Sequence, residues 1–146
     1  MQFFVVVTAL LASVASAADI CGATGSNCNG NRFCCRGIQE GGCCTFGGLA
    51  NSIEFKLPAR SRGRAWSAAG CPGNPQNTFS TNVATTICQQ WSSRRSAKWL
   101  TGTSLAKAKR EPLTQPEDCV QASQVITARG EVLTIAEAEE RGIKME

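Results

Sequence analysis

The sequence predicts a small disulfide-rich, mainly β protein. We expect a cysteine-rich loop head, an antiparallel β-sandwich or barrel, and a C-terminal β-hairpin with a short helix. Three observations lead to this prediction. Eight of the nine cysteines lie in the first 88 of 146 residues. Short segments with alternating apolar and polar residues are separated by Gly and Pro turns. The N-terminus has the pattern of a secretory signal peptide.

Residues 1–18 are predicted to be that signal peptide. An apolar run from Phe3 to Val14 ends in the small residues 15–18, which form an Ala-x-Ala-like cleavage site. The run is shorter than the about 20 residues that span a membrane, and no later segment is apolar enough. We therefore expect a secreted, extracellular protein without a membrane span that starts near Asp19. A signal anchor is the alternative.

The first eight cysteines are predicted to form four bridges, because secretion exposes the chain to an oxidising compartment. Adjacent cysteines rarely bond to each other, so the members of each Cys-Cys pair should reach different partners. Spacing alone does not choose among the many pairings. With no His in the chain, we expect no metal site and no cofactor. The predicted bridge residues are Cys21, Cys28, Cys34, Cys35, Cys43, Cys44, Cys71 and Cys88.

The ninth cysteine, Cys119, is expected to stay unpaired or to join two chains in a disulfide-linked dimer. It follows a predicted linker at residues 103–118, which is polar and contains two prolines. Within this linker, Lys109-Arg110 resembles the dibasic sites that kexin-type proteases cut in secreted fungal precursors. An exposed linker is where such cleavage works. The alternative is an ordinary surface pair of basic residues.

Residues 19–102 are predicted to form a disulfide-rich basic β domain. Its first part, residues 19–45, is rich in Gly, Asn and Cys and should be loops and tight turns. Its second part, residues 46–102, should be β. An alternative for the region Gln89–Ser96 is a short helical turn. The expected strands are Ile53–Leu57, Arg64–Ala68, Thr78–Thr81, Val83–Cys88 and Lys98–Thr101.

Residues 119–146 are predicted to be an acidic tail with a hairpin and a helix. The hairpin joins Val125–Thr127 to Val132–Ile135. Thr134 should cap a helix that runs from Ile135 to Arg141, with Glu137 as the reciprocal capping acid, and Gly142 should end it. Such a tail cannot bury a core alone, so it either docks on the β domain or stays mobile.

Charge is distributed unevenly along the chain. Residues 19–110 carry twelve Lys or Arg and three acidic residues, whereas residues 111–146 carry three Lys or Arg and eight acidic residues. Such asymmetry predicts that the acidic tail shields or docks on the basic domain. The alternative is two independently solvated surfaces.

The sequence offers little for catalysis, and we expect no catalytic residue and no enzyme activity. Without His, the Ser-His-Asp and Cys-His arrangements and the His-dependent ribonucleases are excluded. Glycoside hydrolysis needs two facing carboxyl groups. The β domain offers only Asp19, Glu40 and Glu54, in unrelated contexts.

Basic residues interleaved with tryptophan predict a binding surface for phosphate, anionic lipid or an acidic polymer. The candidate partners are an acidic surface, a polysaccharide or a host protein. Alternatively, the tryptophans form the core and the arginines keep the domain soluble. The candidate binding residues are Arg60, Arg62, Arg64, Trp66, Trp91, Arg94, Arg95 and Trp99, and Lys98 lies in the same basic stretch.

The opening Cys-x6-Cys-x5-Cys-Cys, from Cys21 to Cys35, resembles inhibitor cystine knots and hevein-type chitin-binding domains. That resemblance implies a small disulfide module, but it ends at the adjacent pair Cys43-Cys44. The chain as a whole resembles the small secreted cysteine-rich, effector-like proteins of filamentous fungi. This implies an effector-type virulence protein that binds a host or cell-surface component without catalysis. The alternatives are a basic antimicrobial or killer-type toxin and a small hydrolase inhibitor.

Overall fold

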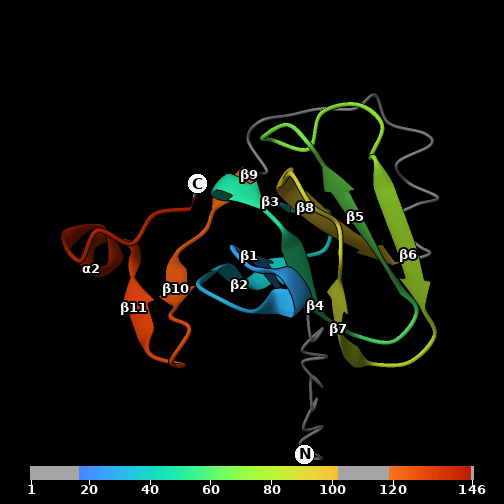
Figure 1. The fold of residues 1–146 in the computed structure, drawn as a ribbon. Coiled ribbons are helices and arrows are strands. Elements are labelled where there is room, and N and C mark those ends of the chain that lie inside the picture. Colours follow the sequence, from blue (N-terminus) through green and yellow to red (C-terminus); the bar gives the residue numbers. More distant parts are fainter. Residues whose placement is uncertain (1–16, 102–118, 146) are drawn as a thin grey trace, which may run out of the picture.

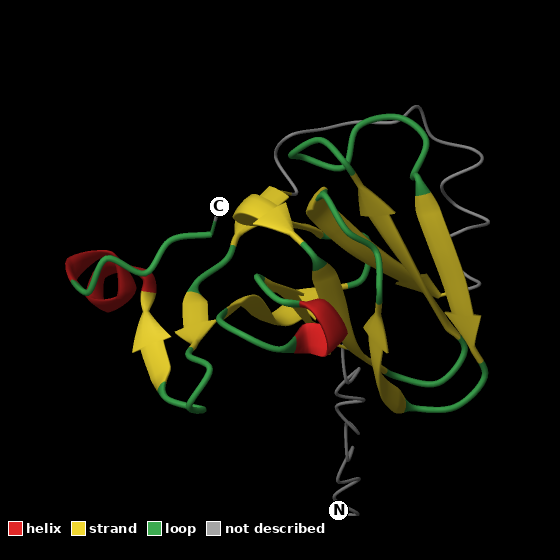
Figure 2. Cartoon of the chain, in the orientation of Figure 1, coloured by secondary structure: helices red, strands yellow, loops and turns green. Residues whose placement is uncertain are grey.

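The computed structural model describes residues 17–101 and 119–145 (Figure 1). Two β-sheets pack against each other, and two short helical segments complete the secondary structure of these residues (Figure 2). The predicted mainly β, disulfide-rich fold is confirmed, and the two sheets stay open rather than closing into a barrel. Residues 1–16 of the predicted signal peptide, and the linker with Lys109 and Arg110, lie outside the described residues.

The first sheet has six strands in the order β11-β10-β2-β1-β4-β7, and every neighbouring pair is antiparallel. A short 3-10 helix, η1 (Ser26–Cys28), connects β1 to β2. The strands are β1 (Ala17–Ala23), β2 (Arg32–Gln39), β4 (Ser52–Leu57), β7 (Thr85–Gln89), β10 (Gln124–Ile126) and β11 (Val132–Thr134).

The second sheet has five strands in the order β6-β5-β8-β3-β9. Its pairs are antiparallel except for β3 and β9, which run parallel. The strands are β3 (Cys43–Ala50), β5 (Ser61–Trp66), β6 (Asn77–Thr81), β8 (Arg94–Thr101) and β9 (Cys119–Gln121).

Residues 19–45, predicted to be loops, instead form β1, β2 and the start of β3. This part of the prediction was wrong because cysteine behaves as a small apolar residue when it is buried. Cys21 and Cys34 are direct cross-strand partners and are almost completely buried. The alternation typical of strands was therefore hidden among Cys and Gly. The same cysteines lie in a two-sheet sandwich, not in the small module that the cystine-knot and hevein resemblances imply.

The five predicted strands of the β segment are present, with ends that differ by a few residues. Ile53–Leu57 corresponds closely to β4, and the other four overlap β5, β6, β7 and β8. The alternative of a helical turn over Gln89–Ser96 was wrong, because β8 already begins at Arg94. Pairing with β3 and β5 determines the extended conformation of the segment that begins at Arg94, and local propensity does not reveal such long-range pairing.

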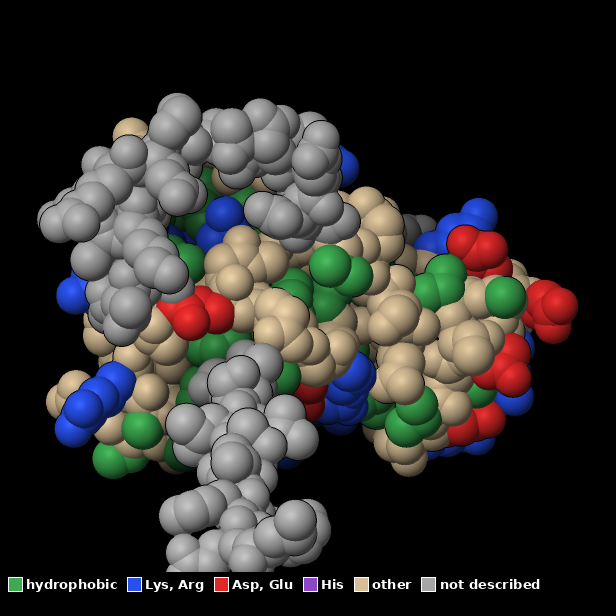
Figure 3. Space-filling view, turned by 180° about the vertical axis from the view of Figure 1, so that it is seen from behind, with side chains coloured by type: hydrophobic (Ala, Val, Ile, Leu, Met, Phe, Trp, Pro, Cys, Tyr) green, Lys and Arg blue, Asp and Glu red, His purple; other side chains and the backbone are tan. Residues whose placement is uncertain are grey.

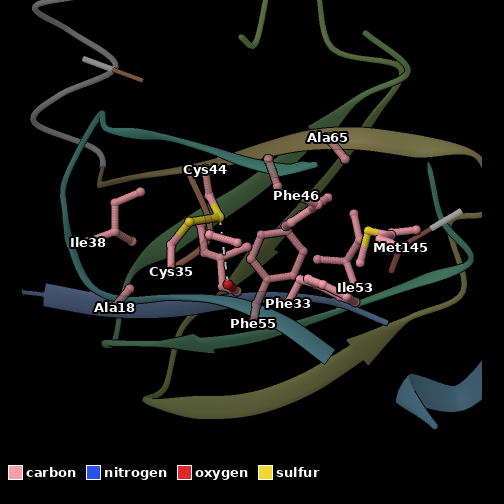
Figure 4. Close-up of a cluster of buried hydrophobic side chains, with 14 of the residues drawn as sticks. Ala18, Phe33, Cys35, Ile38, Cys44, Phe46, Ile53, Phe55, Ala65 and Met145 are labelled. Atoms are coloured by element: carbon pink, nitrogen blue, oxygen red, sulfur yellow. Dashed lines mark hydrogen bonds between the residues drawn. A yellow bond between two sulfur atoms is a disulfide. The ribbon is translucent and has the colours of Figure 1, made fainter. Parts of the chain in front are cut away.

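The core lies between the two sheets and contains large aromatic and aliphatic side chains from both (Figure 4). Trp99 and Phe46 of the second sheet are fully buried, and the indole Nε1 of Trp99 donates to the Ile38 carbonyl at 3.0 Å. Two glycines make room for aromatic rings in or against the core. A Cβ atom on Gly22 would lie 2.7 Å from the Phe46 ring, and one on Gly63 would overlap the Phe79 ring.

Four disulfides join the eight cysteines among residues 17–101, as predicted. Both members of each Cys-Cys pair reach different partners. The Cys35–Cys44 bridge links the two sheets inside the core (Figure 4). The other bridges are Cys21–Cys34, Cys28–Cys88 and Cys43–Cys71. Each bridge is expected to stabilise the fold by about 2–4 kcal/mol, chiefly by restricting the unfolded chain.

The C-terminal segment docks on the β domain. Strand β10 pairs with β2 of the first sheet, and β9 pairs with β3 of the second. Helix α2 (Ile135–Glu140) begins with the predicted capping box, in which the Thr134 and Glu137 side chains each bond the other's backbone amide. Gly142, with φ of +72°, follows the helix, and Met145 reaches the core. The predicted domain boundaries within residues 102–118 lie outside the described residues.

Candidate functional site

The two sheets differ sharply in charge. The five strands of the second sheet carry five Lys or Arg and no acidic residue. The six strands of the first sheet carry three cations and two acids, Asp19 and Glu54. Both of these acids form ion pairs: Arg32 with Glu54 at 3.0 Å and Arg36 with Asp19 at 3.1 Å. The first sheet is therefore largely neutralised, whereas the second is cationic.

Strand β5 places its arginines on the outer face of the second sheet. Side chains alternate between the two faces of a strand, so Gly63 and Ala65, which are buried, point to the core. Arg62 and Arg64 consequently point away from it. The sequence Arg-Ser-Arg-Gly-Arg fits this position, because the glycine faces the Phe55 and Phe79 rings.

Strand β8 adds a third cation at the adjacent position. In the β5–β8 pair, Arg64 faces Lys98 directly and Arg62 faces Leu100. On the other side of β5, Arg64 faces Thr78 and Arg62 faces Ser80, and both of these β6 hydroxyl residues are exposed. We call Arg62, Arg64 and Lys98 the cationic strip.

The environment of Arg64 is unfavourable for its charge. Arg64 is half-buried, and its Nε is buried with no hydrogen-bond partner. Burial, and to a smaller extent the nearby Arg62, lower the pKa of the Arg64 guanidinium. Like charges at directly opposite positions of a sheet also destabilise it. An acidic ligand on this face would relieve both effects.

A disulfide-anchored loop, residues 67–76, borders the cationic strip. The Cys43–Cys71 bridge ties this loop to β3, and the Cys71 amide donates to the Ser96 hydroxyl at 3.0 Å. The loop carbonyl of Gly73 accepts a hydrogen bond from the Trp66 indole at 3.3 Å. The Lys98 ammonium lies 5.9 Å from the centre of the Trp66 ring. The loop thus fixes one side of the surface.

A family model described as the ARB_05566_N N-terminal domain matches residues 19–124, most of the chain. The chain belongs to this family. The match starts at Asp19, the residue near which we expect the mature chain to begin. It includes the whole second sheet and therefore the cationic strip. No curated protein and no solved structure matches the chain.

The structure excludes two predicted tryptophans from the binding surface. Trp66 is 3% exposed and Trp99 is fully buried, so neither ring is free to stack on a ligand. Trp91 is partly buried and packs against Phe55 and Phe79, with ring centres 6.0 and 5.8 Å away. The alternative interpretation, in which the tryptophans belong to the core, agrees with the positions of Trp99 and Trp91. Trp66 is instead buried on the outer face of β5, where it bonds the loop at residues 67–76.

The predicted arginines divide into two groups. Arg62 and Arg64 come together with Lys98, whereas Arg60 precedes β5 and Arg95 lies near the far end of the β5–β8 pair. Arg94 has a structural role, because its Nε donates to the Asn77 side chain at 2.6 Å. The exposed hydroxyls of Thr78 and Ser80 were not predicted as site residues. Only the strand register, which the sequence does not reveal, places them beside the arginines.

The acidic C-terminal residues lie away from the strip. Glu131, Glu137, Glu139 and Glu140 belong to the hairpin turn and α2, next to the edge strands of the first sheet. In Figure 1 this segment and strands β5 and β6 are at opposite ends of the molecule. Seen from behind, acidic side chains gather over that C-terminal end (Figure 3). The tail docks on the basic domain, but these four acids do not shield the strip.

The sequence predicted no membrane span and a possible dimer through Cys119. No helix among the described residues is long and apolar enough to cross a membrane. The predicted dimer through Cys119 has no support: the structure describes the Cys119 backbone, paired with Cys43, but not its side chain.

Proposed function

We propose that this chain is a secreted, non-catalytic, effector-type protein that binds an acidic polysaccharide of a host or cell surface through the cationic strip. One observation carries the proposal: the second sheet has five cations and no acidic residue on its strands. The described acids of the first sheet are already occupied by arginines. A face that holds like charges together at a cost in stability is typical of a binding site.

The arrangement suits a linear polymer with regularly spaced acidic groups. Adjacent strands lie about 4.8 Å apart, and residues two apart on one strand lie about 7 Å apart. Arg62, Arg64 and Lys98 therefore present three charges at short, fixed intervals on a sheet. The neighbouring hydroxyls of Thr78 and Ser80 add hydrogen-bonding groups of the kind that bind sugars.

The toxin alternative is less well supported. A protein that attacks membranes needs apolar side chains beside its cations. The large apolar residues that are exposed in the described part of the chain are Val83, Ile87, Val120 and Val132. None of them lies on β5 or β8. Anionic lipid is therefore the weaker candidate ligand, and the test below includes it.

Two features support secretion. Disulfides persist in oxidising compartments and are rare in the cytosol, so four bridges are typical of an extracellular protein. The family match also leaves out the predicted signal peptide.

Binding to polygalacturonate tests the proposal. We compare the oxidised protein with the double variant Arg62→Gln, Arg64→Gln. The control Lys56→Gln, Arg129→Gln loses the same charge at exposed positions of the first sheet and the hairpin turn. At low salt the strip variant should bind at least about tenfold more weakly than the wild-type protein, whereas the affinity of the control should be nearly unchanged. The affinity of the strip variant should also depend less on salt concentration, because it makes fewer ionic contacts.

Three results would contradict the proposal. Equal losses in the two variants would mean that net charge alone drives binding. The absence of any binding by the wild-type protein would remove the proposed ligand. Binding to phosphatidylserine vesicles but not to polygalacturonate would favour the toxin alternative.

A further inference from the structure

A cavity lies where the C-terminal segment meets the two sheets, away from the cationic strip. Its volume is about 770 Å³, which falls within the range typical of small-molecule sites. It draws on β2, β3 and β9 as well as on α2 and the segment that follows it. Its lining residues are Phe33, Phe46, Gly47, Gln121, Ala122, Ile135, Ala138, Glu139, Ile143, Lys144 and Met145.

The inner wall of this cavity is apolar. Phe33 comes from the first sheet and Phe46 from the second, and both are continuous with the core (Figure 4). Met145 belongs to the same cluster and comes from the C-terminal end of the chain (Figure 4). Ile135 and Ile143 are only partly buried against this core. Apolar side chains that remain partly exposed beside a hollow provide contact area for a ligand.

The C-terminal side of the cavity is held in place by specific contacts. The Ile143 amide donates to the Ala138 carbonyl at 2.9 Å. The backbone at Met145 approaches Gly48 so closely that a Cβ atom on Gly48 would overlap the Met145 carbonyl. Arg141 pairs with Glu131 at 2.9 Å and ties the end of the helix to the hairpin turn. The hollow is thus part of the folded structure.

The polar residues of the cavity determine which ligand would suit it. Gln121, Glu139 and Lys144 are all exposed. Glu139 accepts hydrogen bonds, Lys144 donates them, and the Gln121 amide does both. Because the two charges are opposite, a charged head group would be attracted by one and repelled by the other.

We propose that this cavity binds a small, uncharged amphiphile, with its apolar body against the partly buried Ile135 and Ile143, over a floor formed by Phe33, Phe46 and Met145. A hydroxyl or amide head group would lie near Gln121, Glu139 and Lys144. Such a group both donates and accepts hydrogen bonds and has no net charge to be repelled. This site is separate from the proposed polysaccharide surface, and neither depends on the other.

Three ligands with the same chain length test the head-group preference: 1-decanol, decanoate and decylammonium. Titration of the oxidised full chain, followed by NMR shifts or calorimetry, should show decanol binding about fivefold or more tighter than either ion. Glu139→Gln leaves Lys144 unopposed, so decanoate should gain several-fold in affinity while decanol changes little.

Two variants that fill the cavity test its location. Ile135→Trp fills it from the helix, and Gln121→Trp fills it from the exposed surface of β9. Each should weaken decanol binding about tenfold or more. Val132→Trp is the control, because Val132 is exposed on β11 and does not line the cavity. Circular dichroism of each variant shows whether the fold is kept, and Gln121→Trp remains informative if Ile135→Trp does not fold.

The proposal would be overturned by any of three results. The wild-type protein could fail to bind decanol. Folded Gln121→Trp could bind decanol as well as the wild-type protein does. Decanoate could be the preferred ligand of the wild-type protein, which would mean that Lys144 alone governs recognition.

Discussion

Arg64 and Lys98 are direct cross-strand partners in the β5–β8 pair, so two cationic side chains leave the second sheet at adjacent positions on one face. Arg62 lies two residues away on the same face of β5. No acidic residue occurs on any strand of this sheet. Like charges at adjacent positions repel each other, and an acidic ligand on this face would reduce that repulsion.

This arrangement predicts that a substitution in the strip stabilises the fold. Arg64→Thr removes one of two facing cations and introduces a residue with high β propensity. We expect the free energy of unfolding to rise by about 0.5 kcal/mol at low salt, with a smaller gain at high salt because the repulsion is screened. Urea denaturation at two salt concentrations measures both values. A loss of stability at low salt would show that Arg64 makes a net favourable contribution in the free protein.

Gly63 is predicted to be essential for packing rather than for binding. An added methyl group would overlap the Phe79 ring and meet Phe55, both in or against the core. Gly63→Ala should therefore lower the free energy of unfolding by about 1–3 kcal/mol. Adding Phe79→Leu creates space, so the double variant should be more stable than the sum of the two single effects implies. Strict additivity in thermal or urea unfolding would argue against this contact.

The Cys43–Cys71 disulfide is predicted to hold the loop at residues 67–76 against the second sheet. Replacing both cysteines with Ala should destabilise the protein by about 2–4 kcal/mol. It should also speed amide hydrogen exchange within the loop, where Cys71 bonds Ser96. Exchange followed by mass spectrometry measures the local effect, and exchange in β4 of the first sheet is the internal control. Unchanged protection of the loop would mean that its hydrogen bonds alone suffice.

The capping box at Thr134 and Glu137 predicts a specific pH dependence. The Thr134 backbone amide donates to the Glu137 carboxylate, and the Thr134 hydroxyl accepts from the Glu137 backbone amide. Bonding to Thr134, first through its backbone and then through its side chain, lowers the pKa of Glu137. Because the pKa of Glu137 is lower in the folded state than in the unfolded chain, the ionised carboxylate stabilises the fold, and this stabilisation is fully present above the pKa of the unfolded chain. The contribution is lost as the pH falls through the folded pKa.

Thr134→Ala removes the side-chain bond but keeps the backbone amide, which is the larger cause of the lowered pKa. The variant should therefore raise the Glu137 pKa only part of the way toward its ordinary value, as measured by NMR titration. Loss of an N-cap should also lower the melting temperature by about 3–5 °C at neutral pH. Thr127→Ala, in the hairpin turn, is the comparison variant for the pKa and should leave it unchanged. If Thr134→Ala leaves the Glu137 pKa unchanged, the Thr134 side chain does not contribute to lowering that pKa in solution.

Much of this fold could be predicted from the sequence, where local patterns are strong. The alternation in Ile53–Leu57 and the spacing of Thr134 and Glu137 led to the correct strand and cap. The segment around Cys21 and Cys34 could not be interpreted in this way, because buried cysteine takes the place of apolar residues in the pattern.

The candidate site was only partly predictable. Arg62 and Arg64 were named as candidate residues, but the predicted strand began at Arg64, so their common face was not predicted. The position of Lys98 opposite Arg64 depends on long-range strand register. The burial of Trp66 depends on a loop that is fixed through Cys71, and the sequence does not specify this pairing. The cavity combines Phe33 and Phe46 with the C-terminal segment, so it could not be recognised before the docking of that segment was known.

The most direct test of the binding surface is NMR mapping of backbone amides during titration with short polygalacturonate oligomers. We predict that the largest shifts occur at Arg62, Arg64 and Lys98 and at their β6 neighbours Thr78 and Ser80, and that they vanish as salt is raised. Largest shifts at Lys56 or Arg129, or no shifts at low salt, would contradict the proposal that the second sheet binds an acidic polysaccharide.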